Sequence, residues 1–537
     1  MESLAQDLSQ MQRTPLADEH VDMIRAAGVE QTFPGGSLVV TAGHPMDAFI
    51  YCEEGQIEVV DPLTNERAIE ATVGPTQYLG EVSFLNGGTW AISMRAVVDT
   101  RCVVVPRTRM LELMANVPEM SDIIVTVFAA RRRRIVEDNN SALTIIGAEE
   151  DRNLGRVLSF ASRNKIPIRT FDLGTDEANE FLRQAGLPEN EPAFILGRDE
   201  VIENPSPRRL ARMAGLDLPL AGEDAFDVVI IGGGPAGIAA AVYAGAEGLS
   251  ALVVEDQVIG GQAGSSSRIE NYMGFPTGIS GADLCFRGEI QAMRLGARFV
   301  MPRRVVSIRQ HNDRYCIGLD DGEDIAAKAI VVATGVQYRR LPIDRLTDFE
   351  GQGVYYSATD IEARYCRKSE AVIIGGGNSA GQAAMFLSRS ASHVHVLVRG
   401  KALADSMSAY LSSRLEQDPK ITVHFQTECI SLEGEDKLQT IRVRDKETGE
   451  EREITTPALF VMVGAAPKTD WLEGTVALDE KGFILTGGAD HCPSAYATSA
   501  PGIYAVGDVR AGSTKRVASG VGEGSVVIAH VWNYVNR

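Results

Sequence analysis

Three glycines that directly follow an apolar run are the first pattern in this sequence that could do chemistry. The run at 226–231 is typical of a buried strand, and small residues open the helical segment after it: Gly232, Gly234, Pro235, Ala236 and Gly237. Glycines at this spacing allow a tight turn, approach of the backbone to a pyrophosphate, and close helix–strand packing. The N–H groups at the start of such a helix bind phosphate oxygens. The pattern predicts a dinucleotide-binding unit.

An acidic residue closes the next apolar run. The run Ala251–Val254 ends in Glu255, which is placed to accept hydrogen bonds from ribose hydroxyls. A glycine motif alone is weak evidence. Strand, glycines, helix, strand and acid in this order make the dinucleotide assignment specific.

A second glycine motif follows the apolar run 371–374, and its residues are Gly375, Gly377, Asn378, Ser379 and Ala380. Ala380 fills the third small-residue place. The next strand, expected at 394–398, ends in Arg399 rather than in an acid. An arginine pairs with a 2′-phosphate that an acid would repel, so NADPH is favoured over NADH. The alternative is an exposed arginine that binds no ligand.

Three shorter segments could complete a flavin site. Gly260-Gly261-Gln262 could bring backbone close to an isoalloxazine ring, and Ala333-Thr334-Gly335 closes an apolar strand. Gly507-Asp508 follows the strand at 503–506, where Asp508 could bond a ribityl chain. Together with the two glycine motifs, these segments predict FAD, a nicotinamide dinucleotide, and electron transfer between them.

Length and composition bound the scaffold that positions these residues. The 537 residues suffice for three or four domains, and the formal net charge of -20 argues against broad binding to nucleic acid. The absence of a long apolar run and of a signal-like start predicts a cytoplasmic chain without a membrane span. The seven cysteines are scattered and include no Cys-x-x-Cys, so we expect neither a metal site nor a disulfide framework.

The N-terminal part is organised differently from the rest. Short strands cut by glycine turns at 30–105 predict a small antiparallel roll, and helical spacing follows at 110–135. Its run Arg131–Arg134 is interpreted as a solvated helix end. From about residue 140 a small α/β unit precedes a linker at 216–224. The remainder alternates strands and helices, as a doubly wound α/β protein does.

The C-terminal motifs together resemble the low-molecular-weight thioredoxin reductase family over about 225–537. The resemblance implies an FAD domain in two parts, 225–340 and 464–537, around an NAD(P)H domain at 341–463. It also implies a homodimer. By the same resemblance, the segment containing Asn271 contacts the flavin, and three residues lie beside its pyrimidine: Arg516, Val517 and Ala518.

The departure from that family concerns its redox cysteines. In the matching stretch 355–360, Ser357 takes the place of the first cysteine, and Asp360 stands beside the missing second one. A hydroxyl forms neither a disulfide nor a reactive thiolate, so we predict no reduction of thioredoxin. Cys366 is interpreted as a structural thiol. Relatives that lack the pair include thioredoxin-reductase-like ferredoxin–NADP reductases, which points to ferredoxin, flavodoxin, a quinone, a small molecule or oxygen as acceptor.

Two resemblances describe the N-terminal part. Residues 1–139 resemble a cyclic-nucleotide-binding domain, in which Gly80 and Glu81 belong to the phosphate cassette and Glu81 would bind a ribose 2′-OH. Trp90 stands where the arginine that pairs with the phosphate is expected, which argues against ordinary cyclic-nucleotide binding. Residues 140–219 resemble a thioredoxin or glutaredoxin domain without redox cysteines, and Glu191-Pro192-Ala193 resembles its cis-proline turn.

The predicted fold class is therefore a multidomain α/β protein with two Rossmann-like domains behind a β-roll and a thioredoxin-like unit. Two functions remain open. One is an oxidoreductase that takes hydride from NADPH onto FAD and passes electrons to a non-disulfide acceptor. The other is a flavin- and nucleotide-binding sensor with little turnover. A thioredoxin reductase whose thiols meet only in the folded chain is a further alternative.

Overall fold

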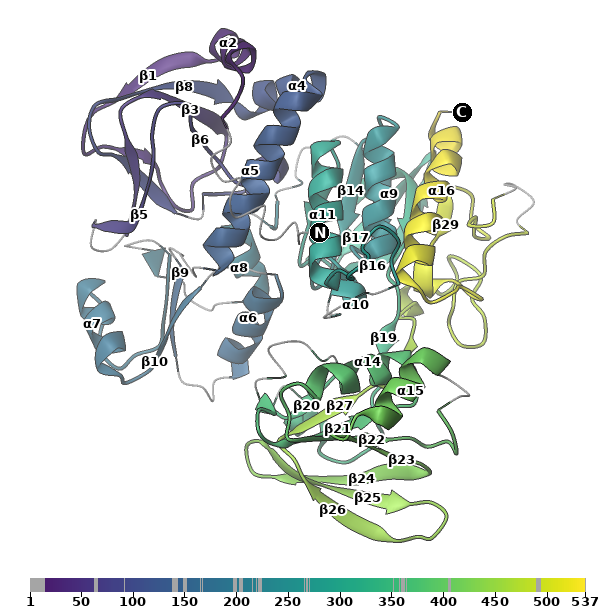
Figure 1. The fold of residues 1–537 in the computed structure, drawn as a ribbon. Coiled ribbons are helices and arrows are strands. Elements are labelled where there is room, and N and C mark those ends of the chain that lie inside the picture. Colours follow the sequence, from purple (N-terminus) through teal and green to yellow (C-terminus); the bar gives the residue numbers. More distant parts are fainter. Residues whose placement is uncertain are drawn as a thin grey trace.

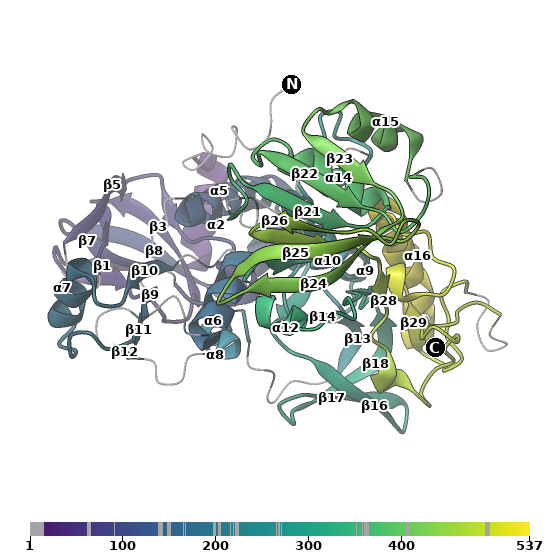
Figure 2. The ribbon, with the colours of Figure 1, turned by 90° about the horizontal axis from the view of Figure 1, so that it is seen from below.

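The computed structural model is a chain of four modules (Figure 1). They are the roll, a small α/β unit, and the two domains that the sequence predicts to bind FAD and NADPH, called here the flavin domain and the nicotinamide domain. Figure 2 shows the roll and the small α/β unit on the same side of the molecule. The structure describes residues 15–61, 66–90, 92–137, 143–147, 152–164, 166, 168–196, 200–201, 206–214, 216–218, 220, 225–264, 266, 269, 271–350, 352–356, 358, 363, 365–403, 407–488 and 494–536.

The roll consists of two antiparallel sheets. One has the order β1 (Val29–Phe33), β8 (Thr100–Pro106), β3 (Ala48–Glu54), β6 (Tyr78–Leu79), and the other β2 (Leu38–Val40), β7 (Ser93–Ala96), β4 (Ile57–Val60), β5 (Arg67–Val73). Its helices are α2 (Asp18–Ala27), α3 (Ser83–Asn86), α4 (Arg107–Asn116) and α5 (Pro118–Glu137). The helical segment predicted at 110–135 is thus two helices, because a proline favours a new helix start and disfavours a helical residue before it.

The small α/β unit has a four-stranded sheet. It contains β9 (Leu143–Gly147), α6 (Arg152–Arg163), β10 (Arg169–Asp172), α7 (Asp176–Gln184), β11 (Ala193–Leu196), β12 (Glu200–Val201) and α8 (Pro207–Met213). The sheet order is β10-β9-β11-β12, with β9 and β10 parallel and the other pairs antiparallel. The likeness to a cis-proline turn is wrong, because the cis bond of the described chain is Met301–Pro302 and Pro192 keeps the trans bond that X–Pro units favour.

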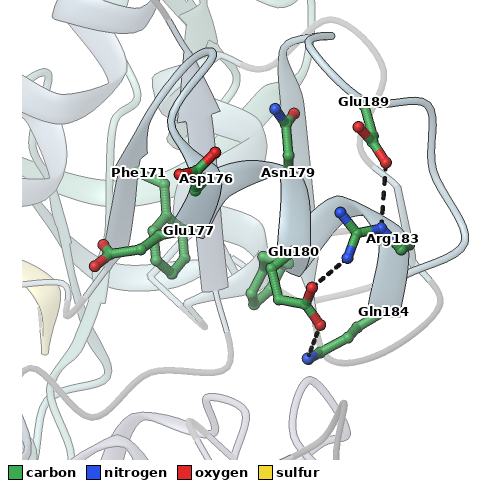
Figure 3. A pocket seen from close by; sticks show the side chains of 9 residues that line it. Phe171, Asp176, Glu177, Asn179, Glu180, Arg183, Gln184 and Glu189 are labelled. Carbon is green, nitrogen blue, oxygen red and sulfur yellow. Dashed lines mark hydrogen bonds and ion pairs between the residues drawn. The ribbon is translucent and has the colours of Figure 1, made fainter.

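An open hollow lies beside α7 on this unit (Figure 3). Within it Arg183 binds Glu180 and also Glu189, the latter with an Nε–Oε1 distance of 3.2 Å. Gln184 donates to Glu180 at 2.9 Å. Four polar side chains of the hollow therefore bind one another, as on an ordinary solvated helix face: Glu180, Arg183, Gln184 and Glu189.

The flavin domain is built on a seven-stranded sheet. Its order is β15 (Arg298–Val300), β14 (Ala251–Val254), β13 (Phe226–Ile231), β18 (Asp324–Val332), β17 (Arg314–Leu319), β16 (Val305–His311), with β29 (Ile503–Ala505) also pairing with β18. β13, β14, β15 and β29 run parallel to β18, and β16 and β17 form an antiparallel extension. Helix α9 (Pro235–Ala246) packs against α11 (Gly281–Arg294) and α16 (Val517–Val535).

The nicotinamide domain has a parallel sheet and a smaller antiparallel one. The parallel order is β20 (Val354–Tyr355), β27 (Ala458–Val461), β21 (Glu370–Ile374), β22 (His393–Leu397), β23 (Ile421–His424). β24 (Thr427–Gly434), β25 (Leu438–Asp445) and β26 (Glu451–Thr455) form the second sheet, and the helices include α12 (Leu346–Phe349), α14 (Asn378–Leu387) and α15 (Ala409–Gln417). Two chain segments connect the flavin domain to the nicotinamide domain. They pair with each other as the short strands β19 (Gln337–Tyr338) and β28 (Ala465–Ala466).

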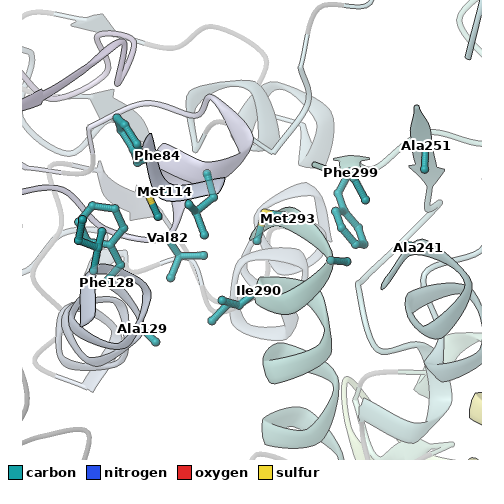
Figure 4. Packing of buried hydrophobic residues seen from close by; sticks show 14 of the residues in the cluster. Val82, Phe84, Met114, Phe128, Ala129, Ala241, Ala251, Ile290, Met293 and Phe299 are labelled. Carbon is teal, nitrogen blue, oxygen red and sulfur yellow. The ribbon is translucent and has the colours of Figure 1, made fainter. Parts of the chain in front are cut away.

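The roll and the flavin domain share one hydrophobic core. Val82 of the roll lies opposite the side of α11 that carries Ile290 and Met293 (Figure 4), and Phe84 belongs to the same cluster through its packing against Phe128. The Asn86 side chain makes two hydrogen bonds with the backbone of Phe299 on β15, each 3.2 Å long. At the end of α11, the Arg294 side chain donates to Ser121 and forms an ion pair with Asp122 of α5.

A buried ion cluster joins α8 to the flavin sheet. Arg303 is 2% exposed and binds Asp217, whose side chain has no exposed surface. Arg303 also binds Asp321 at 2.9 Å, and Arg208 of α8 bridges Asp217 to Asp321. Because buried charges are tolerated only when they are paired, this cluster fixes the linker against the sheet.

No helix in the described part of the chain has both the length and the apolar character that crossing a membrane requires.

Candidate functional site

The first glycine turn has the geometry that phosphate binding requires. β13 leads to Gly232, whose φ of +110° favours glycine, and Gly234 is the N-cap of α9. A Cβ at Gly237 would lie 1.9 Å from the carbonyl oxygen of Gly232, so this position brings helix and strand together. The N-terminus of α9 therefore presents backbone N–H groups beside a turn without side chains.

Two distant segments meet that turn. A Cβ at Gly232 would lie 2.4 Å from the carbonyl oxygen of Ala333, and one at Gly507 would lie 3.0 Å from the Cβ of Ala236. The hydroxyl of Thr334 is buried and has no hydrogen-bond partner in the protein. A buried polar atom without a partner costs free energy unless a ligand or water satisfies it. This orphaned hydroxyl and the glycine cradle fit a bound dinucleotide.

Glu255 lies at the end of β14 with its carboxylate buried. It accepts hydrogen bonds from the backbone N–H groups of Gly233 at 2.7 Å, Gln257 at 2.9 Å and Val258 at 3.3 Å. Burial, with a smaller contribution from Asp256, raises the pKa of Glu255 to about 7 although these donors oppose the shift. A carboxylate has about four acceptor sites, so one remains for a ribose hydroxyl.

Asp508 lies in a short 3-10 helix at Gly507–Val509, directly after β29. Burial raises its pKa, and Lys515 opposes that shift. Beside it is Glu523, which is 8% exposed on α16 and which we did not predict. Glu523 accepts the N–H of Gly507 at 2.6 Å and binds Arg510 at 2.8 Å. The sequence could have indicated Glu523, because it is a single acidic residue within an otherwise apolar helical stretch.

The start of α16 and helix α10 (Gly261–Gly264) both lie close to the first glycine turn, since a Cβ at Gly520 would lie 3.5 Å from the Cβ of Ala236. Arg516 is the N-cap of α16, and Val517 and Ala518 open that helix. Gln262 of α10 donates its side-chain amide to the carbonyl of Val336, and a Cβ at Gly261 would lie 3.3 Å from the Cα of Gly234. Asn271 is exposed. Four other segments thus meet the turn at residues 232–237, through Glu255, Gly261, Ala333 and Gly507.

The second glycine turn repeats the first. Gly375 has φ +149°, and a Cβ there would lie 2.4 Å from the carbonyl oxygen of Met462. Gly377 is the N-cap of α14, and Asn378 accepts the backbone N–H of Ser408 at 2.8 Å. Ser379 is exposed and Ala380 is buried. The turn therefore offers the same cradle to a second dinucleotide.

Arg399 is exposed two residues beyond the end of β22. Arg399→Ala should raise the KM for NADPH about ten-fold or more, because a charge-assisted contact with the 2′-phosphate is worth about 1.5–3 kcal/mol. The KM for NADH should barely change. Steady-state kinetics with both dinucleotides measures this, with Lys401→Ala as the matched control. Equal effects on the two dinucleotides would show that Arg399 does not read the phosphate.

A histidine cluster lies between the two sheets of the nicotinamide domain. His395 contacts His424 at 2.9 Å and Glu370 at 3.1 Å, and Arg452 approaches His424 at 2.6 Å. Burial lowers the pKa of His395, and burial with the Arg452 charge lowers the pKa of His424 to about 4. No group of His, Cys, Asp and Glu side chains within the described residues is arranged to hold a metal ion.

The histidine cluster predicts that the protein is less stable in acid. Between about pH 6.5, the pKa of a histidine in an unfolded chain, and about pH 4, the unfolded chain binds protons that the folded cluster does not. Stability should therefore fall as the pH drops through this window, by about 1–2 kcal/mol once solvent screening of a half-exposed cluster is counted. Thermal unfolding from pH 4 to 7 measures it. His424→Gln should flatten the slope, and an unchanged slope would contradict the assignment.

The predicted positions Ser357 and Asp360 lie outside the described residues. Cys366 is fully buried with its Sγ 3.5 Å from the carbonyl oxygen of Ala363, and burial raises its pKa to about 11. A thiol with that pKa stays protonated near neutral pH. This geometry agrees with a structural role for Cys366.

Two arginines near the end of α5 contact the cassette segment of the roll around Gly80 and Glu81. Arg131 donates to the carbonyls of Tyr78 at 2.5 Å and Gly80 at 3.2 Å, and Arg132 lies 3.9 Å from the buried carboxylate of Glu81. The solvated helix end predicted for these two arginines is wrong, because α5 packs along the cassette and turns them towards it. Arg95 on β7 forms an ion pair with Glu58 on the neighbouring strand β4 at 2.5 Å.

Comparisons with known proteins agree with this geometry. A family model described as pyridine nucleotide-disulphide oxidoreductase matches residues 226–524, and a cyclic nucleotide-binding domain model matches residues 30–117. The chain is 35% identical to a thioredoxin reductase of Streptomyces clavuligerus over 302 residues, covering 56% of this chain and 91% of the relative. It is 32% identical over 314 residues to that of Treponema pallidum, covering 58% and 98%.

A solved thioredoxin reductase from Lactococcus lactis, in its FR conformation, is 31% identical with a TM-score of 0.54 and covers 58% of this chain and 99% of its own. Together these matches show an NAD(P)H-dependent flavoprotein oxidoreductase fused to a cyclic-nucleotide-binding-type roll. The chain belongs to the pyridine nucleotide-disulphide oxidoreductases, and within them to the thioredoxin reductase family.

Proposed function

We propose that this protein takes hydride from NADPH onto FAD and passes the electrons to an acceptor that is not a protein disulfide. The observation that carries the proposal is the contrast between two complete dinucleotide turns and a stretch at 355–360 without a cysteine. FAD supplies the conversion of a two-electron hydride into electrons for a second acceptor. The chain binds and orients the two dinucleotides.

In this proposal each glycine turn holds the pyrophosphate of one dinucleotide. The turn at Gly232 holds FAD, Glu255 accepts a ribose hydroxyl, and Asp508 accepts from the ribityl chain. The turn at Gly375 holds NADPH, and Arg399 meets its 2′-phosphate. The protein acts as a homodimer, with ferredoxin, flavodoxin or a quinone as acceptor.

The state of two described thiols of the nicotinamide domain, Cys366 and Cys429, supports a non-disulfide acceptor. Disulfide exchange requires a thiolate that attacks and a second thiol that resolves the mixed disulfide. Burial raises the pKa of Cys366 to about 11 and that of Cys429 to about 12, so both remain protonated at neutral pH. Neither is suited to start such a relay.

The test has two stages on the full-length protein. Rapid mixing with NADPH without oxygen should bleach the flavin absorbance, and thioredoxin with insulin should then stay oxidised. The thioredoxin reductase of Streptomyces clavuligerus serves as the positive control. Screening ferredoxin, flavodoxin, quinones and oxygen identifies the acceptor. Robust insulin reduction that disappears in a variant with all cysteines changed to serine would refute the proposal.

A second candidate function is a flavin-dependent sensor, favoured by the direct contact of helix α3 of the roll with the flavin domain through Asn86 and Phe299. The same rapid-mixing experiment separates the two. A flavin that stays oxidised in excess NADPH supports the sensor and contradicts the reductase.

A further inference from the structure

Two cysteines that are fifty positions apart in the sequence face each other in the roll. Cys52 lies in β3 and Cys102 in β8, and the antiparallel register pairs them directly. β3 and β8 are neighbouring strands of the roll (Figure 1). Both side chains are fully buried, and no disulfide joins them in this structure.

The backbone hydrogen bonds show what kind of pair this is. The N–H of Cys52 donates to the carbonyl of Gln77 at 2.8 Å, and its carbonyl accepts from Thr76 at 3.1 Å. Both groups of Cys52 therefore point towards the β6 side of β3 and away from β8. In an antiparallel ladder the opposed residues are then a non-hydrogen-bonded pair, with a Cα–Cα separation of about 4.5 Å. Disulfides form across about 4.4–6.8 Å.

The two thiols lie next to each other in the core of the roll. The Cys52 thiol donates to the backbone carbonyl of Glu54 at 3.6 Å. Interaction with Cys102 lowers the pKa of Cys52, and interaction with Cys52 together with burial raises that of Cys102. Either sulfur can serve as the attacking atom and the other as the resolving one. One attacking sulfur and one resolving sulfur in contact are what thiol oxidation to a disulfide requires.

We propose that Cys52 and Cys102 form a reversible cross-strand disulfide, with hydrogen peroxide as the oxidant. The thiolate of one of the two cysteines, written here as Cys52, attacks one peroxide oxygen, which breaks the O–O bond and leaves a sulfenic acid and hydroxide. The sulfur of Cys102 then attacks the sulfenic sulfur, and the S–S bond forms as the sulfenic oxygen leaves as water with the Cys102 proton. The two thiols lose two electrons and two protons, and peroxide becomes two waters. A dithiol reductant restores both thiols.

The location connects this pair to the rest of the molecule. The backbone of Cys52 is bonded to residues 76 and 77, which lead into β6 and then into α3, the helix that contacts the flavin domain. A covalent bond between β3 and β8 holds β3 more firmly against both neighbours. We therefore expect slower amide hydrogen exchange in β3, β8 and β6 after oxidation.

The experiment treats reduced full-length protein with hydrogen peroxide in the absence of NADPH. The expected result is a mass loss of two hydrogen atoms, a Cys52–Cys102 cross-linked peptide in the digest, slower exchange in β3, β8 and β6, and reversal by dithiothreitol. Cys52→Ser and Cys102→Ser should each abolish the cross-link. Cys316→Ser, at a partly exposed thiol of the flavin domain, is the matched control and should leave it intact.

Two results would overturn the proposal. One is that Cys52 and Cys102 both remain open to alkylation after unfolding, at a peroxide dose that oxidises Cys316. The other is that the cross-link appears only when the chain is unfolded before oxidation. Neither result depends on which acceptor the flavin uses, so the proposed function is tested separately.

Discussion

Arg303→Met should lower the free energy of unfolding by about 3 kcal/mol or more, because removing one partner of a buried ion pair leaves the other charge buried and uncompensated. Arg303 is 2% exposed and contacts Asp217, Asp321 and Glu323. Arg208 and Arg212 remain near Asp217, at 3.2 Å and 2.9 Å, and keep the loss from being larger.

Guanidinium unfolding followed by circular dichroism measures the loss. Arg309→Met is the matched control, since Arg309 is 61% exposed and pairs with Asp324 at 2.9 Å on the surface. Exposed pairs contribute about 0–1 kcal/mol, so this variant should stay close to the parent. Equal losses in the two variants would mean that the Arg303 cluster contributes no more than a surface pair.

Glu255→Ala should bind FAD about tenfold or more weakly than the parent and purify with less of it. The variant loses the acceptor for a ribose hydroxyl, and each hydrogen bond to a charged group is worth about 1.5–3 kcal/mol, where 1.4 kcal/mol is a tenfold change in affinity. It also leaves the N–H groups of Gly233, Gln257 and Val258 without their acceptor, which loosens the turn that holds the pyrophosphate.

The ratio of flavin to protein absorbance after purification measures the loss. Glu255→Gln keeps the shape and one acceptor oxygen and should retain an intermediate amount of FAD. Asp256→Asn changes the neighbouring, partly exposed acid and should retain nearly all of it. A Glu255→Ala protein that is fully yellow, with unchanged affinity for FAD, would remove Glu255 from the site.

The sequence predicted the parts of the site that depend on local spacing. Gly232, Gly237 and Glu255 belong to one continuous strand–turn–helix–strand unit, so their positions follow from residues within about 30 of one another. The second glycine motif, at Gly375, was predicted for the same reason, because its residues lie close together in the sequence. The strand expected after it at 394–398 is β22, which ends one residue earlier.

Features that depend on long-range register could not be predicted. Cys52 and Cys102 meet because β3 and β8 pair across about fifty residues, and no spacing rule connects them. Arg131 was interpreted as solvated because its helix gives no sign of the cassette packed against it. Glu523 and Arg303 were missed because a single charged residue in an apolar segment does not reveal its distant partner.

The contact between α11 and the roll makes this fusion less modular than its domain order implies. Ile290 and Met293 are buried in a core that also contains Val82 and Phe84. Asn86 binds Phe299 of the edge strand β15, and the carbonyl of the adjacent Val300 accepts the backbone N–H of Glu255. Cutting the chain at the linker would uncover an apolar helix face and free that edge. The roll therefore covers an apolar surface of the flavin domain. A shortened protein that starts at the flavin domain would expose this surface and should associate with other copies of itself in solution.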